Sequence, residues 1–148
     1  MSDSSKIDDA IRIGSHADTL QAVEHSAAAK LLRYDGEQYP HDGCAITLST
    51  LLQEAGIDVP DTYQALALGN ALIKRGWSKI QVGQQKSGDI GSTCGNAPNH
   101  GSDHIFLVLK ALGTSEMVIA DNQAHAPHFR WANGKGGKTP ARFFLRAS

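Results

Sequence analysis

The sequence is short of several residue types, and each shortage excludes a class of protein. Two cysteines, Cys44 and Cys94, occur in 148 residues, which is too few for a scaffold held by disulfides. No apolar run approaches the roughly 20 residues of a membrane-spanning helix. Lys and Arg number 14 against 15 Asp and Glu, so there is no positive surplus to hold a nucleic-acid backbone. We expect neither a nucleic-acid partner nor a membrane span.

The remaining composition is that of an ordinary globular protein, with 41% hydrophobic and 20% charged residues. The length predicts one domain, which we place at residues 16–148. Residues 1–10 are polar and acidic, and we expect residues 1–15 to form a flexible arm that Ile11 and Ile13 could dock. This segment has no basic region followed by an apolar one, so we expect synthesis in the cytoplasm without a Sec signal.

Three segments in the first half of the chain have helical periodicity. The clearest follows the glycine-rich turn that ends at Gly43, with Gly56 just past its end as a left-handed cap and Asp42 as its candidate N-cap. Asp61 is the candidate cap of the third helix, and Gly76 its stop. The predicted helices are 17–33, 44–55 and 62–75.

After Trp77 the pattern changes to short β-strands. The run His104–Leu109 is continuously apolar after its histidine, which is typical of a buried strand, and 117–120 reads as its hairpin partner. The predicted strands are 79–82, 89–90, 104–109, 117–120, 128–131 and 142–145. Helices followed by strands indicate an α+β domain with an antiparallel sheet.

Cys44 is the candidate nucleophile. In the first turn of a helix, its thiol lies near unpaired N–H groups and the positive end of the helix dipole, which favour the thiolate and are expected to lower the pKa. The plain alternative is an inert buried cysteine.

His104 is the candidate base, because it stands where the most apolar strand begins at a surface edge. A third group must hold its far nitrogen, and the strand ending at Asp121 and Asn122 supplies two candidates. A hairpin centred near Gly113 places His104 opposite Asn122 with Asp121 offset by one, and a one-residue slip would exchange them. Turn chemistry alone could also account for this Asp-Asn pair.

These motifs together resemble a known family. The segment Tyr34–Cys44, the step Ser87–Ile90, the strand His104–Leu109 and the strand end Ile119–Asn122 are similar to the papain-like cell-wall peptidases and amidases of the NlpC and CHAP types. The resemblance implies a papain-like fold, with N-terminal helices and the cysteine at the start of a central helix packed on an antiparallel sheet.

The resemblance further implies acyl transfer on an amide of the bacterial peptidoglycan peptide stem. Cys44 would attack the carbonyl, His104 would move the proton, and Asp121 or Asn122 would orient His104. No cofactor or metal is required. Tyr34, Tyr39 and Asp42, in the loop before the cysteine, are the candidate substrate-binding residues, although ordinary packing would equally explain the two tyrosines.

Other readings stay open. A zinc site could be assembled from five donors, although their spacing matches no zinc motif and His125 and His128 read more simply as polar loop and strand groups. A Cys44–Cys94 disulfide would silence the nucleophile. A deamidase or transferase toxin, or a binding module without activity, could share the fold. The five donors are Cys94, His100, His104, His125 and His128.

A wall hydrolase without a Sec signal needs another route to the periplasm. We expect either a type VI secretion effector or a phage lysin released through a holin, with the effector favoured. An effector implies a cognate immunity protein that plugs the cleft in the producing cell.

Overall fold

In the computed structural model, which describes residues 2–99 and 103–148, four α-helices and a short 3-10 helix precede a six-stranded sheet. Every strand pair is antiparallel, and the strand order is β1-β6-β2-β3-β4-β5. The predicted α+β class is therefore confirmed. The helices are η1 (Asp3–Lys6), α1 (Ile7–Ser15), α2 (Ala17–Asp35), α3 (Cys44–Glu54) and α4 (Ala65–Lys74). The strands are β1 (Ser78–Ile80), β2 (Ile90–Ser92), β3 (Ile105–Ala111), β4 (Glu116–Ala120), β5 (His128–Trp131) and β6 (Phe143–Arg146).

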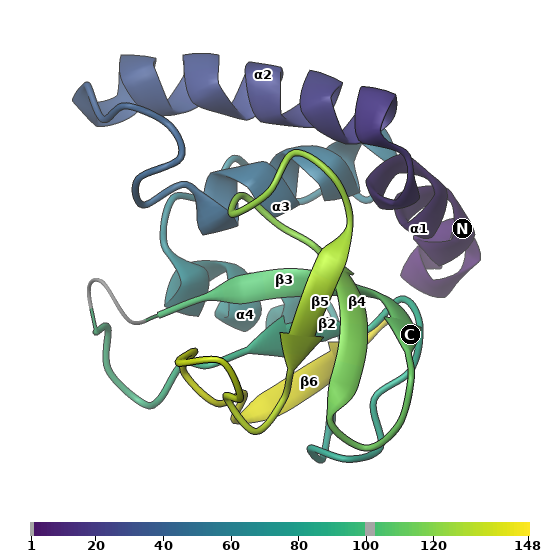
Figure 1. Ribbon diagram of the computed structural model, residues 1–148. Helices are drawn as coiled ribbons and strands as arrows, with labels where there is room; N and C mark the ends of the chain where they lie inside the picture. The colour runs from purple at the N-terminus through teal and green to yellow at the C-terminus, as the bar shows by residue number, and fades with distance from the viewer. Residues whose placement is uncertain (1, 100–102) are drawn as a thin grey trace.

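The main core lies between the helices and one face of the sheet. Helix α3 lies between α2 and the sheet, so α2 forms an outer layer (Figure 1). Strand β3 is buried on both faces, because Leu107 joins the core under the helices while Phe106 and Val108 join a second cluster. This alternation follows from the two-residue period of a strand, and it confirms the prediction of a buried strand here.

The N-terminal segment is the clearest departure from expectation. Residues 3–15, predicted to form a flexible arm, are helical, and Ala10 and Ile13 are buried in the main core. A Cβ added at Gly14 would lie 3.0 Å from Ala120 Cβ, so α1 approaches β4 closely. Apolar residues at positions 7, 10, 11 and 13 share one helical face, and burying that face outweighs the polarity of the rest.

Helix ends follow the glycines as predicted but not the proposed acidic caps. Gly56 follows α3 with φ +92° and donates its N–H to Gln53 O at 2.9 Å. Helix α4 begins at Ala65 rather than Thr62, and Asp61 instead accepts a hydrogen bond from Lys30 Nζ at 2.8 Å. No helix in the described ranges combines the length and apolar character needed to cross a bilayer.

Candidate active site

Cys44 is the first residue of α3, as predicted, but the cap before it differs. Gly43 is the N-cap, and no side chain caps this end of the helix. Asp42 has φ 54°, a left-handed conformation, and its exposed carboxylate lies 3.5 Å from His41 Nε2. The prediction that Asp42 caps α3 was therefore wrong. The turn is closed instead by the Gly43 N–H, which donates to Pro40 O at 3.0 Å.

The Cys44 sulfur lies against the start of β3. The backbone N–H groups of Ile105 and Ala45 both donate to it, which ties the helix start to the residue that follows His104. Burial raises the pKa of the Cys44 thiol to about 11, and these two hydrogen bonds offset only part of the effect. Desolvation of the thiolate therefore outweighs the lowering of the pKa that we expected from the helix end.

His104 immediately precedes β3 and is held by its backbone and its ring. Its N–H donates to Thr93 Oγ1 at 2.8 Å, and its carbonyl accepts from the Thr93 N–H at 3.1 Å. The ring stacks on Phe106, with centroids 5.9 Å apart, and its Nε2 lies 2.7 Å from Asp121 Oδ2. Since Nε2 contacts the carboxylate, Nδ1 is the nitrogen available to the thiol.

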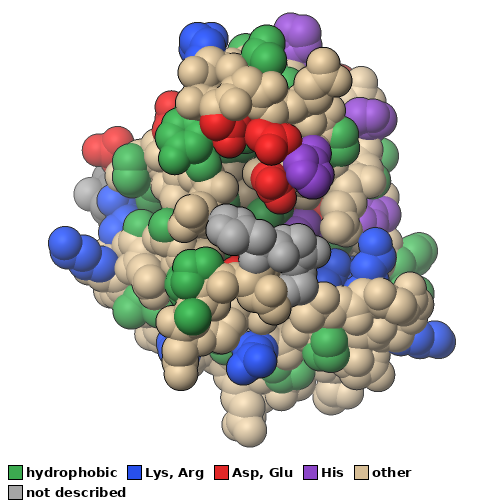
Figure 2. Space-filling model, turned by 90° about the vertical axis from the view of Figure 1, so that its left-hand side faces the viewer, with side chains coloured by type: hydrophobic (Ala, Val, Ile, Leu, Met, Phe, Trp, Pro, Cys, Tyr) green, Lys and Arg blue, Asp and Glu red, His purple; other side chains and the backbone are tan. Residues whose placement is uncertain are grey.

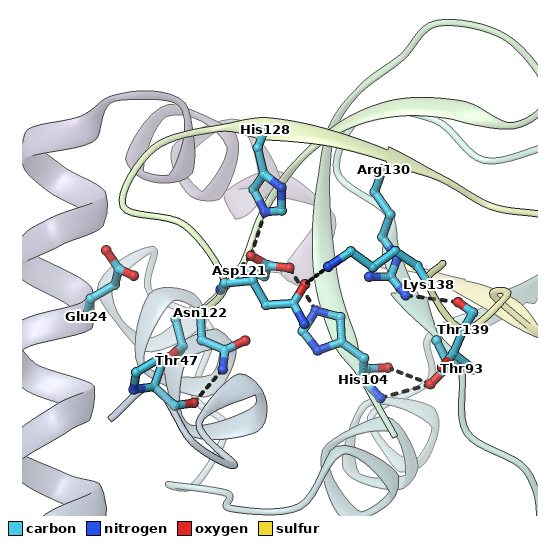
Figure 3. Close-up of polar contacts among 12 residues, drawn as sticks. Glu24, Thr47, Thr93, His104, Asp121, Asn122, His128, Arg130, Lys138 and Thr139 are labelled. Atoms are coloured by element: carbon cyan, nitrogen blue, oxygen red, sulfur yellow. Dashed lines mark hydrogen bonds and ion pairs between the residues drawn. The ribbon is translucent and has the colours of Figure 1, made fainter. Parts of the chain in front are cut away.

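Asp121 follows the end of β4, and its side chain is fully shielded from solvent. Besides the His104 contact, Oδ1 accepts from His128 Nε2 at 2.7 Å and from the Gln123 N–H at 2.9 Å (Figure 3). Burial alone would raise the Asp121 pKa, but the hydrogen bonds from His104 and His128 outweigh it and hold the pKa well below its usual range. The site therefore contains a buried, ionised carboxylate shared by two histidines.

Asn122, the other candidate for the third residue, points elsewhere. The register of the hairpin pairs Leu107 with Ala120, one residue away from the expected pairing, and it shifts again between Val108 and Lys110. With this register Asp121 contacts His104, while Asn122 Nδ2 donates to Pro40 O at 2.8 Å. Asn122 thus ties the strand end to the loop before Cys44.

A cavity of about 530 Å³ contains both Cys44 and His104 in its lining. It lies between the loop before α3, the start of α4 and the ends of β3 and β4. Tyr34 and Tyr63 stack on one side of it, with ring centroids 3.8 Å apart. Acidic side chains and a histidine gather on this face of the molecule (Figure 2). The described lining includes the carboxylates of Asp35, Asp42 and Asp103 and neither lysine nor arginine.

Only two of the three residues predicted to bind substrate line this cavity in its described part. Tyr34 and Asp42 line the cavity, but Tyr39 is absent from its described lining. The Tyr39 hydroxyl instead donates to Glu24 Oε2 at 3.2 Å and lies 2.9 Å from Thr47 Oγ1. Burial raises the pKa of Tyr39, which keeps the phenol neutral. Tyr39 therefore packs the loop against α2 and α3, and its assignment to the substrate stays a prediction.

The residues of the alternative zinc and disulfide readings have other partners. Both cysteines are free thiols, and the Cys94 N–H donates to Ser92 Oγ at 3.1 Å. His125 Nδ1 lies 3.2 Å from Glu24 Oε1, while His104 and His128 both contact Asp121. His100 lies outside the described residues. The described members of the proposed zinc set are thus divided among separate polar contacts.

His128 contacts Asp121, which the sequence did not indicate. It opens β5, where a polar residue at a strand end is unremarkable, and no local spacing connects it to Asp121. Only the β4–β5 register, which pairs Ile119 with His128, brings the two side chains together.

The comparisons with known proteins supply no relative. No protein-family model, no curated protein and no solved structure matches this chain.

Proposed function

We propose that this chain is a cysteine-dependent hydrolase that cleaves an amide bond of bacterial peptidoglycan, on a papain-like fold. One observation carries the proposal: Cys44 and His104 line the same cavity, and a buried Asp121 holds the far nitrogen of His104. A nucleophile, a base and a group that orients the base are the three parts that acyl transfer through a thiol requires.

The first half of the reaction follows from the protonation states. His104 donates from Nε2 to Asp121, so the neutral ring presents Nδ1 as an acceptor. Because the thiol of Cys44 is protonated at neutral pH, His104 takes its proton as the sulfur attacks the substrate carbonyl carbon. The imidazolium that forms is stabilised by the Asp121 carboxylate beside it.

The oxyanion of the tetrahedral intermediate needs donors at the start of α3. At the start of α3, the first backbone N–H that donates to a carbonyl four residues earlier is that of Thr47, which donates to Gly43 O. The N–H of Cys44 itself precedes that bond and is our candidate donor. His104 then gives its proton to the leaving amine. A water molecule, deprotonated by His104, attacks the resulting thioester and releases the carboxylate product and the thiol.

The charge of the cavity favours one kind of substrate segment. Its described lining carries carboxylates at Asp35, Asp42 and Asp103, with no lysine or arginine to balance them. Such a wall attracts an ammonium group and repels a carboxylate. The diamino acid of the peptidoglycan stem carries a free amine, so we place the cleaved bond next to that residue.

Digestion of purified peptidoglycan, with the released muropeptides identified by mass spectrometry, tests the proposal. We expect cleavage by the wild type and none by Cys44→Ala. Cys94→Ala is the matched control, because it removes the other, buried thiol and is expected to leave cleavage intact. If the reduced wild type releases no fragment, or if Cys44→Ala still releases them, the hydrolase proposal is wrong.

The proposed reaction also implies where the protein would act. Peptidoglycan lies outside the cytoplasm, so the enzyme would reach the periplasm by a secretion apparatus or a phage holin. A cognate immunity protein would protect a producing cell by filling the cavity.

A further inference from the structure

A second histidine, His128, contacts the Asp121 carboxylate oxygen that His104 does not contact. We propose that His128 is a positioning residue of this site, which holds Asp121 in the orientation that serves His104. The inference rests on the proposed function for its catalytic meaning, but its geometry is independent of any substrate.

The sheet places His128 on this carboxylate by register. His128 is paired with Ile119 across β4 and β5, and Asp121 is two residues beyond Ile119. Side chains two apart in a strand point to the same face, so Asp121 extends beyond β4 on the face that His128 occupies. The acceptor follows the end of β4 and the donor opens β5, and these are the last two strands at one edge of the sheet.

The carboxylate depends on these donors because water does not reach it. The side chain of Asp121 has no exposed surface, whereas that of His128 is 27% exposed. Oδ2 contacts His104, and Oδ1 accepts from His128 and from the Gln123 N–H. Without His128, Oδ1 keeps one backbone donor, and a buried carboxylate with an unfilled lone pair can rotate away from His104.

The cationic groups near the pair favour an anion at Asp121. Arg130, also on β5, is buried, and its guanidinium lies 5.0 Å from the Phe106 ring centre, the ring on which His104 stacks. Its attraction to Asp121 raises the Arg130 pKa, although burial has the larger, opposite effect. Lys138 Nζ is 3.5 Å from Gln123 Oε1 at the edge of the same cluster. Burial raises the pKa of Cys44 and of Tyr39, the Asp121 charge adds to that effect, and both groups are neutral when protonated.

A purely structural role for His128 would have different consequences when the residue is replaced. The His128–Asp121 contact would then only fasten β5 to the turn after β4, and its loss would lower stability without changing how His104 binds a proton. The two roles are separated by any measurement that reports the proton on His104 in the folded protein.

His128→Leu and His128→Gln form the test pair. Leucine removes the donor at similar bulk, and glutamine keeps an N–H donor at about the reach of Nε2. For peptidoglycan cleavage we expect His128→Leu to lower kcat about 10-fold with KM unchanged, and His128→Gln to recover most of the loss. NMR titration of the His104 ring in the folded proteins needs no substrate. Its midpoint should move to lower pH in His128→Leu, because a misaligned Asp121 stabilises the imidazolium less.

Three results would overturn the inference that His128 positions Asp121. An unmoved His104 titration in folded His128→Leu would reduce His128 to a structural contact. A shift to higher pH would show that His128 competes with His104 for the carboxylate. Equal impairment of both variants would exclude the N–H donor as the cause. If the wild type cleaves nothing while the titration shifts as expected, the proposed function fails and the positioning role of His128 stands.

Discussion

Replacing Asp121 by asparagine changes one atom of a buried group that two histidines share. The amide keeps one oxygen and presents an NH₂ group in place of the other. One of the two histidines, His104 or His128, then faces a donor instead of an acceptor. The negative charge that both contacts use is also lost.

The size of the effect follows from these contacts. Hydrogen bonds to a charged group contribute about 1.5–3 kcal/mol each, and the variant loses one and weakens the other. We therefore expect Asp121→Asn to lower the free energy of unfolding by about 2–4 kcal/mol at pH 7, and to lower kcat by at least about 100-fold because His104 loses its orienting charge.

The loss of unfolding free energy in Asp121→Asn should depend on pH in a defined direction. The folded-state pKa of Asp121 lies below its unfolded value of about 4. Its carboxylate therefore stabilises the fold fully above that value, and the stabilisation is lost as the pH falls toward the folded-state pKa. The difference between wild type and Asp121→Asn should narrow below about pH 4.

Urea unfolding at a series of pH values measures this difference. The matched control is Asp9→Asn, because the Asp9 carboxylate is 62% exposed and its contact with Arg12 is 3.5 Å long. We expect that variant to stay within about 0.5 kcal/mol of the wild type. A deficit for Asp121→Asn below about 1 kcal/mol at pH 7, or one that persists undiminished in acid, would refute the reasoning.

Two further predictions concern the thiol and the sheet. In Cys94→Ala, alkylation of Cys44 by iodoacetamide should accelerate with pH up to about 11, because burial raises the thiol pKa to about 11; a rate that levels off near neutral pH would contradict this. Gly91→Ala would place a Cβ 2.2 Å from the Phe106 ring and should cost about 1–3 kcal/mol in urea unfolding. Gly113→Ala, with no atom within 4 Å of the added Cβ, is its control, and equal stability of the two variants would argue against that packing.

The sequence is informative where the controlling interactions are local. Apolar periodicity and the glycines at its two ends predict the helix that begins at Cys44. The uninterrupted apolar run after His104 predicts the strand there. Both patterns arise from neighbouring residues, so the places of Cys44 at a helix start and of His104 at a strand start could be predicted directly. The predicted register of the hairpin was two residues off at Lys110 and one residue off at Leu107, because neither the centre of the turn nor the bulge between Val108 and Lys110 has a sequence marker.

Features set by distant partners could not be read in this way. Nothing near His128 indicates that its strand pairs with the one before Asp121. The raised pKa of Cys44 depends on burial, which the sequence around the helix start does not reveal. Residues 7–13 do carry a helical apolar face, but such a face is buried only where other elements cover it, and α1 packs against α2, α3, β3 and β4.

The packing of the first helical turn also bears on the order in which the fold is completed. Asp3 accepts hydrogen bonds from Arg75 and Trp77, and the Ser4 N–H donates to Ser148 O at 3.0 Å. Pairing between residues so far apart in the sequence slows folding. We therefore expect η1 to become ordered late, together with the strands next to His104 and Asp121, and the candidate site to be completed at the same stage.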